Sequence, residues 1–505
     1  MCGIFVTNDP LINQDMQETI EKTLRFRGPD CSSGLIEHNG WKAYHSRLAI
    51  IDVESGVNQP LILDDGGLLV FNGEILNFVE LGEKYFNTRY KSDTVLLGDL
   101  AQSGYLDLAE LDGFFAFIYI SPTGELKHCA RDRFGVKPLF YHKRDGFISF
   151  SSEPNTLKKL FNLSVNDHAI EEYRAVRAPI LSGSFFTGID EVAPSTCLIN
   201  GEYFNLLAHL DGEYENIDIA SLKVAMEKGI KTRQVSDAPI GLLLSRGIDS
   251  NLLKELGEFD KYYTIGFRGD EDLEYLREQN IDNLSIFECD PETYRAEFNH
   301  LLSLRGEPMS VPNEVLLSII AKTAAAEGVK VLLSGEGADE FFAGYDRIFK
   351  WASDASQFDF DVFLEMYCYI TPIKGSQLYV RMLSIFDGLT FVSPFETVRW
   401  FFIRYHMPIL FRRLDFSLMA AGIEGREPIA NMHTFQLAAK MSPAALMGQV
   451  LGKTPLRELI SPYKGHDFAF EKKVGFPVDL TEIFDQYDDE NSYEIWFKEN
   501  LRIIK

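Results

Sequence analysis

The second residue of the chain, Cys2, follows Met1 directly and opens the apolar run CGIFVT. If Met1 is removed, Cys2 carries a free α-amino group and a thiol on the same carbon. The amine titrates near pH ~8 and a free thiol near ~8.5, so the amine can take the thiol proton close to neutral pH. This arrangement fits a nucleophile with its own base. An ordinary buried cysteine that happens to lie early in the chain is the alternative.

Four further clusters in the first hundred residues combine charged side chains with turns. RFRGPD and HSRLAIID each place an arginine beside a strand and a turn, FNGEILN sets Asn-Gly-Glu directly after a strand, and KSDT begins a helical stretch. Each cluster alone fits a surface arginine, a hairpin turn or a helix cap. Together they supply one cation, one anion and an amide-polarising turn, which is what a site for a free amino acid requires.

Two motifs in the second half follow apolar strands. PIGLLL leads into SRGIDSN (residues 245–251), and VLLSGEGADEFFAGYDR covers residues 331–347. A loop of small residues between a parallel strand and a helix directs backbone amides at an anion. The GxxxxGK[ST] pattern of a Walker loop is absent. A generic strand-to-helix turn capped by Ser or Asp is the alternative.

The elements that must position these residues change character near residue 205. Up to that point short strands alternate with Gly, Asp and Asn turns, with helical stretches at 15–25 and 94–103, which predicts packed antiparallel sheets. Beyond it, short apolar strands alternate with long helical patterns, which predicts a parallel sheet, and the chain from Phe349 onward is mostly helical. We therefore predict an α+β αββα sandwich over residues 2–205 and an α/β domain over residues 206–505.

Composition narrows the classes of function. The formal net charge of −26 disfavours nucleic acid and anionic membranes as partners, so an anionic ligand must meet local cations. Six scattered cysteines without CxxC spacing argue against a zinc site or a disulfide framework and favour a reducing cytoplasm. We find no HExxH pair, no secretory signal and no apolar run long enough to span a bilayer.

The ordered set CGIF, RGPD, RLAIID, NGEI, SDT, LDGFFAF and RDRFGVKPLFY resembles the glutaminase domain of class II, N-terminal-nucleophile glutamine amidotransferases. More narrowly, it resembles the asparagine synthetase family, and the similarity covers almost all of the first 155 residues. The resemblance implies that Cys2 attacks the glutamine amide, with Asn72 and Gly73 forming the oxyanion hole. It further implies that Arg47 holds the glutamine carboxylate, Asp93 its ammonium group, and Glu74 helps to fix the amino end.

In the second half, SRGIDSN resembles the pyrophosphate loop of the ATP pyrophosphatases, and VLLSGEGADE resembles the second signature of the asparagine synthetase family. The resemblance implies ATP as the nucleotide, aspartate as the acceptor and Mg²⁺ held by Asp249 and Asp339. Glu336 would lie by the acyl-adenylate and Asp339 on the acceptor side. The implied ATP-binding residues are Leu243, Ser245, Gly247, Asp249, Ser250, Ile265, Ser334, Gly335 and Lys453.

Four positions depart from the family pattern and leave the acceptor open. Arg246 replaces a glycine of the pyrophosphate loop, Asn251 a serine, Asn431 an acid and Glu471 an arginine, whereas Lys473, Gly475 and Phe476 are kept. The leading hypothesis is a glutamine-hydrolysing asparagine synthetase. The alternatives are a family member with another carboxylate acceptor and a protein whose synthetase half only binds nucleotide. A homodimer, the coupling of the two sites and the removal of Met1 are left open.

Overall fold

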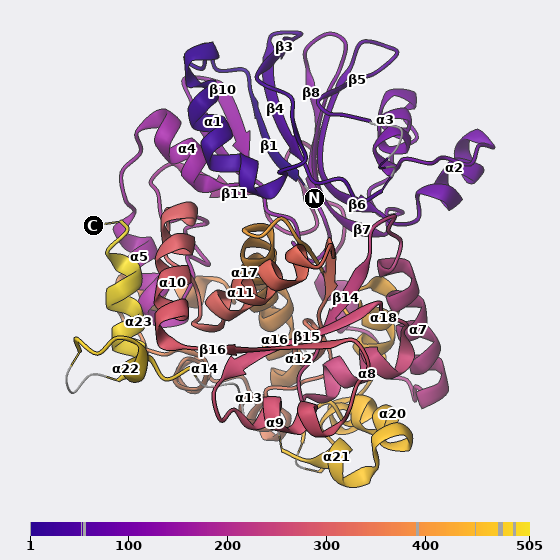
Figure 1. The fold of residues 1–505 in the computed structure, drawn as a ribbon, viewed down its shortest axis with the longest axis vertical. Helices are drawn as coiled ribbons and strands as arrows, with labels where there is room; N and C mark the ends of the chain where they lie inside the picture. Colours follow the sequence, from indigo (N-terminus) through magenta and orange to yellow (C-terminus); the bar gives the residue numbers. More distant parts are fainter. Residues whose placement is uncertain are drawn as a thin grey trace.

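The computed structural model describes residues 2–51, 53, 57–389, 393–449, 451–472, 478–487 and 491–504. The upper part of Figure 1 contains two antiparallel sheets that face each other, with helices on their outer faces. The first sheet has the order β11-β9-β10-β1-β4-β2, with β3 paired to β4. Its strands are β1 (Cys2–Thr7), β2 (Cys31–Ser32), β3 (Ile36–His38), β4 (Trp41–Arg47), β9 (Phe140–Arg144), β10 (Phe147–Ser151) and β11 (Ile189–Glu191).

The second sheet has the order β13-β12-β8-β7-β6-β5. Its strands are β5 (Leu61–Ile62), β6 (Leu68–Ile75), β7 (Gly113–Ile120), β8 (Leu126–Arg131), β12 (Thr196–Cys197) and β13 (Gly201–Glu202). The helices of this part are η1 (Gln14–Met16), α1 (Gln17–Leu24), η2 (Arg25–Arg27), α2 (Phe78–Phe86), α3 (Asp93–Ser103), α4 (Pro154–Phe161) and α5 (Asp167–Val176).

Strand β1 is buried on both of its faces, because alternate side chains of the strand pack into two different apolar layers. Ile4 and Val6 point into the apolar layer between the two sheets, whereas Phe5 packs in the layer beneath α1 and α4. The strand lies between β10 and β4 in the first sheet. This central position fixes Cys2, the first described residue, at the edge of the sandwich that faces the second half of the chain (Figure 1).

The second half is built on a parallel sheet of order β16-β15-β14-β17-β18. Its strands are β14 (Ile240–Leu243), β15 (Lys261–Phe267), β16 (Leu284–Cys289), β17 (Val331–Leu333) and β18 (Glu424–Arg426). Helices cover it, because parallel strands joined by crossovers are buried on both faces. The described helices that start between residues 206 and 350 are α6 (Leu206–Leu210), α7 (Ile219–Arg233), α8 (Ile248–Leu256), α9 (Glu271–Glu278), α10 (Pro291–Arg305), α11 (Asn313–Ala326), α12 (Ala338–Phe341) and α13 (Asp346–Asp354).

Among the described residues beyond 354, β18 is the only strand, and the aromatic residues of this part form much of the core. Its helices are α14 (Phe360–Tyr367), α15 (Gln377–Ser384), α16 (Pro394–Phe401), the π-helical η3 (Phe402–His406), α17 (Met407–Met419), α18 (Met432–Lys440), α19 (Pro443–Met447), α20 (Thr454–Lys464), α21 (His466–Phe470), α22 (Leu480–Ile483) and α23 (Ser492–Leu501). In the described part of the chain, no helix is both long and apolar enough to cross a membrane.

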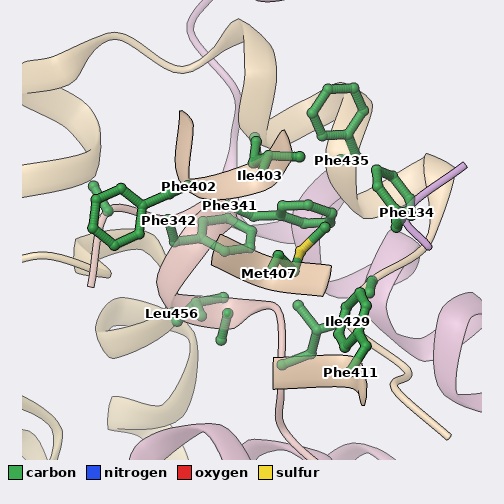
Figure 2. Packing of buried hydrophobic residues seen from close by; sticks show 14 of the residues in the cluster. Phe134, Phe341, Phe342, Phe402, Ile403, Met407, Phe411, Ile429, Phe435 and Leu456 are labelled. Carbon is green, nitrogen blue, oxygen red and sulfur yellow. The ribbon is translucent and has the colours of Figure 1, made fainter. Parts of the chain in front are cut away.

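The two halves share one continuous apolar cluster (Figure 2). The Phe134 ring, from the first half, lies 5.3 Å from the Phe341 ring and 5.7 Å from the Phe435 ring, both from the second. Aromatic pairs at such distances add to the free energy of burial. The contact therefore holds the sandwich against the parallel sheet at a fixed position.

The predicted fold class is confirmed, and the expected helices at 15–25 and 94–103 correspond to α1 and α3. The strand β18 lies inside the stretch that we expected to be helical. Only three residues, Glu424–Arg426, form it, and a run this short carries no readable alternation. The domain boundary near residue 205 stays a prediction.

Candidate active sites

The first site forms around Cys2. Strand pairing places Cys2 opposite Arg47, and the Cys2 backbone N–H donates to Asn72 Oδ1 at 2.9 Å. Asn72 is fully buried, and among the described residues its Nδ2 has no hydrogen-bond partner. A buried donor without a partner costs about 1–3 kcal/mol. Asn72 thus offers an N–H donor without a partner next to Cys2.

Gly73 follows Asn72 in β6 with a φ of +141°. A Cβ at this position would lie 2.1 Å from the Phe114 carbonyl oxygen. Both the backbone conformation and the close approach of β7 therefore require glycine. The sequence NG forms this strained strand position here, rather than the two-residue hairpin turn that it commonly makes.

Two buried carboxyl groups, Glu74 and Asp93, lie at the other side of the site. Burial raises the pKa of Glu74 well above its ordinary value, and the carboxylates of Asp93 and Glu424 raise it further. Burial also raises the pKa of Asp93, opposed by the amides of Ile75 and Thr94, which donate to it at 3.0 and 2.7 Å. Such a pair favours a cation between the two carboxyl groups. The structure brings Cys2 together with the five residues expected to bind glutamine.

Burial also raises the pKa of the Cys2 thiol. The thiol is therefore protonated at neutral pH and needs a base before it can act as a nucleophile. Met1, whose removal would free the Cys2 amine, lies outside the described residues.

A buried ion network ties this site to the second half. Arg27 Nε donates to the Cys2 carbonyl oxygen at 3.2 Å. Its Nη1 lies 2.7 Å from Glu153 Oε1, and its Nη2 lies 2.7 Å from Asp415 Oδ2. Asp415, in α17, also lies 3.4 Å from Lys137. Although burial opposes it, Arg27 and Lys137 hold the pKa of Asp415 below its ordinary value. Removing one partner of a buried pair typically costs about 3–5 kcal/mol.

Glu427 lies beside this network and was not singled out in the sequence. It is 2% exposed, and neither carboxylate oxygen has a hydrogen-bond partner among the described residues. Burial raises its pKa to about 8, with Lys137 opposing. A carboxyl that binds its proton more tightly in the folded than in the unfolded chain stabilises the fold at low pH, and loses that contribution as the pH rises towards 8.

We expect Glu427→Gln to flatten the pH dependence of stability. Between about pH 4.5 and 8 the wild-type free energy of unfolding should fall by up to ~1.4 kcal/mol per pH unit from this group, because only the folded chain keeps the proton. The amide cannot ionise, so the variant should gain stability relative to wild type as pH rises. Urea unfolding at pH 5.5 and 8.0 measures this, with the exposed-site variant Glu271→Gln as control. Parallel pH profiles for wild type and Glu427→Gln would show that Glu427 is ionised in the folded protein.

The second site lies at the carboxyl ends of β14 and β17, where open parallel sheets bind ligands. A cavity of about 250 Å³ is lined there by Leu243, Ser245, Asp249, Ser250, Ile265, Ser334, Gly335, Glu336 and Asp339. These are nine of the residues expected around the nucleotide and acceptor. A Cβ on Gly335 would lie 2.8 Å from the Asp249 Cβ, so glycine lets the two loops approach.

A second cavity of about 310 Å³ adjoins the first, since Asp249 and Asp339 line both. It contains Gly247 and Lys453, together with Arg246 and Arg457. Lys453 Nζ lies 2.8 Å from Asp249 and 2.7 Å from Asp339. Although burial opposes it, these two carboxylates raise the pKa of Lys453, which is therefore charged. The first cavity, which has apolar side chains such as Leu243 and Ile265 in its wall, and the second, which has several cations, suit the two ends of a nucleoside polyphosphate.

The Asp249–Asp339 pair also fits a divalent cation. Asp249 Oδ1 is buried without a hydrogen-bond partner among the described residues. In that part of the chain no group of three or more His, Cys, Asp or Glu side chains could hold a metal ion. Mg²⁺ keeps several waters and takes one or two carboxylates beside phosphate oxygens. Two aspartates are thus sufficient where a polyphosphate supplies further ligands.

Two of the departures from the family pattern compensate each other. The Arg246 Nη2 lies 2.6 Å from Glu471 Oε1, and the Arg246 guanidinium lies 5.4 Å from the Tyr275 ring. Lys473, Gly475 and Phe476, which follow Glu471, lie outside the described residues. Arg246, which replaces a glycine of the loop, is therefore paired with Glu471, which replaces an arginine of the family pattern.

We expect Glu471→Ala to tighten the binding of Mg²⁺-pyrophosphate about threefold to tenfold, because the Arg246 guanidinium no longer has this carboxylate as a partner and an anion in the loop attracts it. In the Arg246→Gly background the same change should have no such effect. Glu271→Ala is the matched control, since Glu271 lies 3.9 Å from Arg246 but is 88% exposed. Calorimetric titration measures the affinities. Equal effects in both backgrounds would contradict the pairing.

The other two departures are structural. Asn251 Nδ2 donates to the Ser245 and Gly247 carbonyl oxygens at 2.9 Å each, which braces the loop. Asn431 caps α18 by accepting from the Thr434 N–H at 3.0 Å. Neither residue lines either of these two cavities.

Sequence reasoning missed Arg413, which forms an ion pair with Glu336 at the edge of the first cavity. The segment FRRLD (residues 411–415) could have indicated this pairing, because it places three charged residues in an apolar helical stretch. Charges that a helix buries need partners. Arg412 pairs with Glu153 at 2.5 Å, and Asp415 pairs with Arg27.

Two family models match the chain, a glutamine amidotransferase domain over residues 1–205 and asparagine synthase over residues 221–501. The asparagine synthetase (glutamine-hydrolyzing) 1 of Bacillus subtilis (strain 168) is 31% identical over 381 residues, which are 68% of this chain and 59% of that protein. The asparagine synthetase (glutamine-hydrolyzing) 2 of Lotus japonicus is 28% identical over 386 residues, which are 68% of this chain and 60% of that protein. The chain thus matches about three fifths of the length of these relatives.

Proposed function

This chain belongs to the asparagine synthase family, and from that premise we propose that it is a glutamine-hydrolysing asparagine synthetase, an ATP-dependent carbon–nitrogen ligase. Glutamine, aspartate and ATP are its proposed substrates. The observation that carries the proposal is the presence of two sites in one chain: Cys2 hydrogen-bonded to Asn72, and Lys453 between Asp249 and Asp339. Six free cysteines favour a reducing cytoplasm as its location. A homodimer stays a prediction.

In the first half-reaction, the Cys2 α-amine takes the thiol proton once Met1 is removed, and the thiolate attacks the glutamine amide carbon. Asn72 Nδ2 and the Gly73 N–H donate to the oxygen that gains charge, which is typically worth about 3–4 kcal/mol per donor. Arg47 binds the substrate carboxylate, and Asp93 with Glu74 binds its ammonium group. Ammonia leaves, and water releases glutamate from the thioester.

In the second half-reaction, an aspartate side-chain carboxylate oxygen attacks the α-phosphorus of ATP, and pyrophosphate leaves. Ammonia then attacks the acyl carbon and loses a proton, giving asparagine and AMP. Lys453 lies where it can offset the charge on the departing pyrophosphate, and Arg413 positions Glu336 beside the acyl group. Asp249 and Asp339 would hold Mg²⁺, which would neutralise phosphate charge.

Product analysis tests this proposal. Purified protein given amide-¹⁵N-glutamine, aspartate, ATP and Mg²⁺ should yield glutamate, ¹⁵N-asparagine, AMP and pyrophosphate in equal amounts. Glutamate without asparagine or pyrophosphate would overturn the aspartate assignment. One specific observation favours the alternative of another carboxylate acceptor, namely the residues that line a third cavity.

A further inference from the structure

A cavity of about 340 Å³ lies behind the Glu336 turn, and nothing in the proposed reaction uses it. Its volume is within the range of small-molecule sites, about 300–1,000 Å³. Both halves of the chain build it, since Arg177 comes from the end of α5 whereas most of the other lining residues come from α13, α14, η3 and α17. Residues that carry the argument are Arg177, Tyr345, Tyr367, Phe402, Leu410 and Arg413.

Two cations of this cavity lack part of their hydrogen bonding. Arg177 and Arg413 are 7% and 8% exposed, and the Nε of each has no hydrogen-bond partner among the described residues. The Arg177 guanidinium lies 3.5 Å from the centroid of the Tyr369 ring, a cation–π contact that satisfies no N–H donor. Buried guanidinium donors are expensive to leave unpaired. An anionic ligand group would satisfy them.

Apart from Asp346 and Arg347, the rest of the wall carries no charged side chain, and Tyr345, Tyr367 and Phe402 supply much of it. His406 is hydrogen-bonded between the hydroxyl groups of Tyr345 and Tyr367, each at 3.1 Å. Burial lowers the pKa of His406 to about 3, so its ring is neutral. Tyr345 also donates to Glu340 at 2.6 Å, and Phe402 packs against the Tyr345 ring at 4.6 Å between centroids. Figure 2 shows Phe402 in the shared apolar cluster. Flat, rigid walls of this kind bind aromatic or other apolar bodies.

The cavity is joined to the nucleotide site through two residues. Arg413 pairs with Glu336, which lines the nucleotide cavity. Asp346 lines both this cavity and the one that contains Lys453. A carboxylate bound at Arg413 would therefore lie next to Glu336, where the acyl group is activated. The small polar body of aspartate leaves the aromatic wall uncovered.

We propose that this cavity binds the body of a second class of acceptor, a carboxylic acid with an aromatic group, whose carboxylate contacts Arg413 and Arg177. The inference rests on the adenylation proposed above. The carboxylate oxygen attacks the α-phosphorus of ATP with loss of pyrophosphate. Ammonia then attacks the acyl carbon and loses a proton, so that AMP leaves and a primary aromatic amide forms. The acceptor range of this chain thus extends beyond aspartate.

Binding of 3-phenylpropanoate, measured by calorimetric titration in the presence of α,β-methylene-ATP, tests the cavity directly. Wild type should bind it, and Leu410→Trp, which fills the cavity, should weaken binding at least tenfold. Leu410→Phe should have a smaller effect in the same direction, which covers the case that the tryptophan variant does not fold. Ile373→Trp is the matched control, since Ile373 is 80% exposed. The absence of binding to wild type, or equal binding by folded Leu410→Trp, would overturn the proposal.

Pyrophosphate exchange into ATP distinguishes this inference from the function on which it rests. Exchange supported by 3-phenylpropanoate is the expected result, and exchange with aspartate alone would overturn the second acceptor class. If 3-phenylpropanoate binds in the cavity but no acid supports exchange, then the adenylation itself fails, and the second acceptor class is overturned with it.

Discussion

Replacement of Cys2 by alanine will lower the release of glutamate from glutamine by at least ~10³-fold, because no other group can form the thioester. Asparagine formation from added ammonium chloride should persist, since the second site lies on a different sheet with its own ligands. The two rates are measured on one preparation, by glutamate and asparagine quantification. The variant loses one buried sulfur, so its fold should be retained.

Cys129→Ala is the matched control for this prediction. Cys129 is a free, fully buried thiol that packs in the same apolar layer between the two sheets as Cys2. It should keep glutaminase activity at the level of folded protein. Loss of glutaminase in both variants would indicate a packing defect, and retention in Cys2→Ala would exclude Cys2 as the nucleophile.

The second large effect is expected for Lys453→Met. Lys453 is 5% exposed and lies between two carboxylates, so its replacement removes the ammonium group that pairs with both Asp249 and Asp339. Electrostatic groups aimed at developing charge are typically worth about 10²–10³ in rate. We expect asparagine formation from ammonia to fall by at least that factor, and glutaminase activity to remain.

Lys350→Met is the control, because Lys350 is 46% exposed and pairs with Asp354 on the surface of α13. Removing one partner of a buried ion pair also costs stability, so urea unfolding is measured on each variant. Lys453→Arg restores the charge, but there is little space for the larger guanidinium group. The Lys453 side chain already packs so closely on Gly344 that a Cβ on Gly344 would lie 2.3 Å from Lys453 Cε. An active Lys453→Met variant would exclude a role for this cation in pyrophosphate departure.

The sequence was informative where each functional residue lies in a short motif at a recognisable place on a strand or helix. Short strands separated by Gly, Asp and Asn turns predicted the sandwich, and the family resemblance carried by the ordered motifs implied that Cys2, Arg47, Asn72 and Asp93 form one site. Each of these lies on a strand or at a helix start, so its position follows from the element that carries it. The two nucleotide loops were predicted in the same way, because each follows a parallel strand.

Pairings between distant residues could not be predicted. Arg246 and Glu471 are separated by 225 positions, so in the sequence they are two unrelated departures from the family pattern. In the folded chain they form one ion pair. Glu427 could not be recognised from the sequence, because a charged residue before a proline is typical of an exposed turn. Only the packing of both halves of the chain buries it. The third cavity likewise exists only where α5 meets α17 and η3, far apart in the chain.

The most direct test of the account is transfer of ¹⁸O from the side-chain carboxylate of labelled aspartate to AMP, followed by mass spectrometry in the presence of glutamine, ATP and Mg²⁺. Attack of that carboxylate on the α-phosphorus predicts AMP with one ¹⁸O atom, unlabelled pyrophosphate and the amide in equal amount. Asparagine formed together with unlabelled AMP, or with label in inorganic phosphate, would contradict an acyl-adenylate and with it the role assigned to the second site.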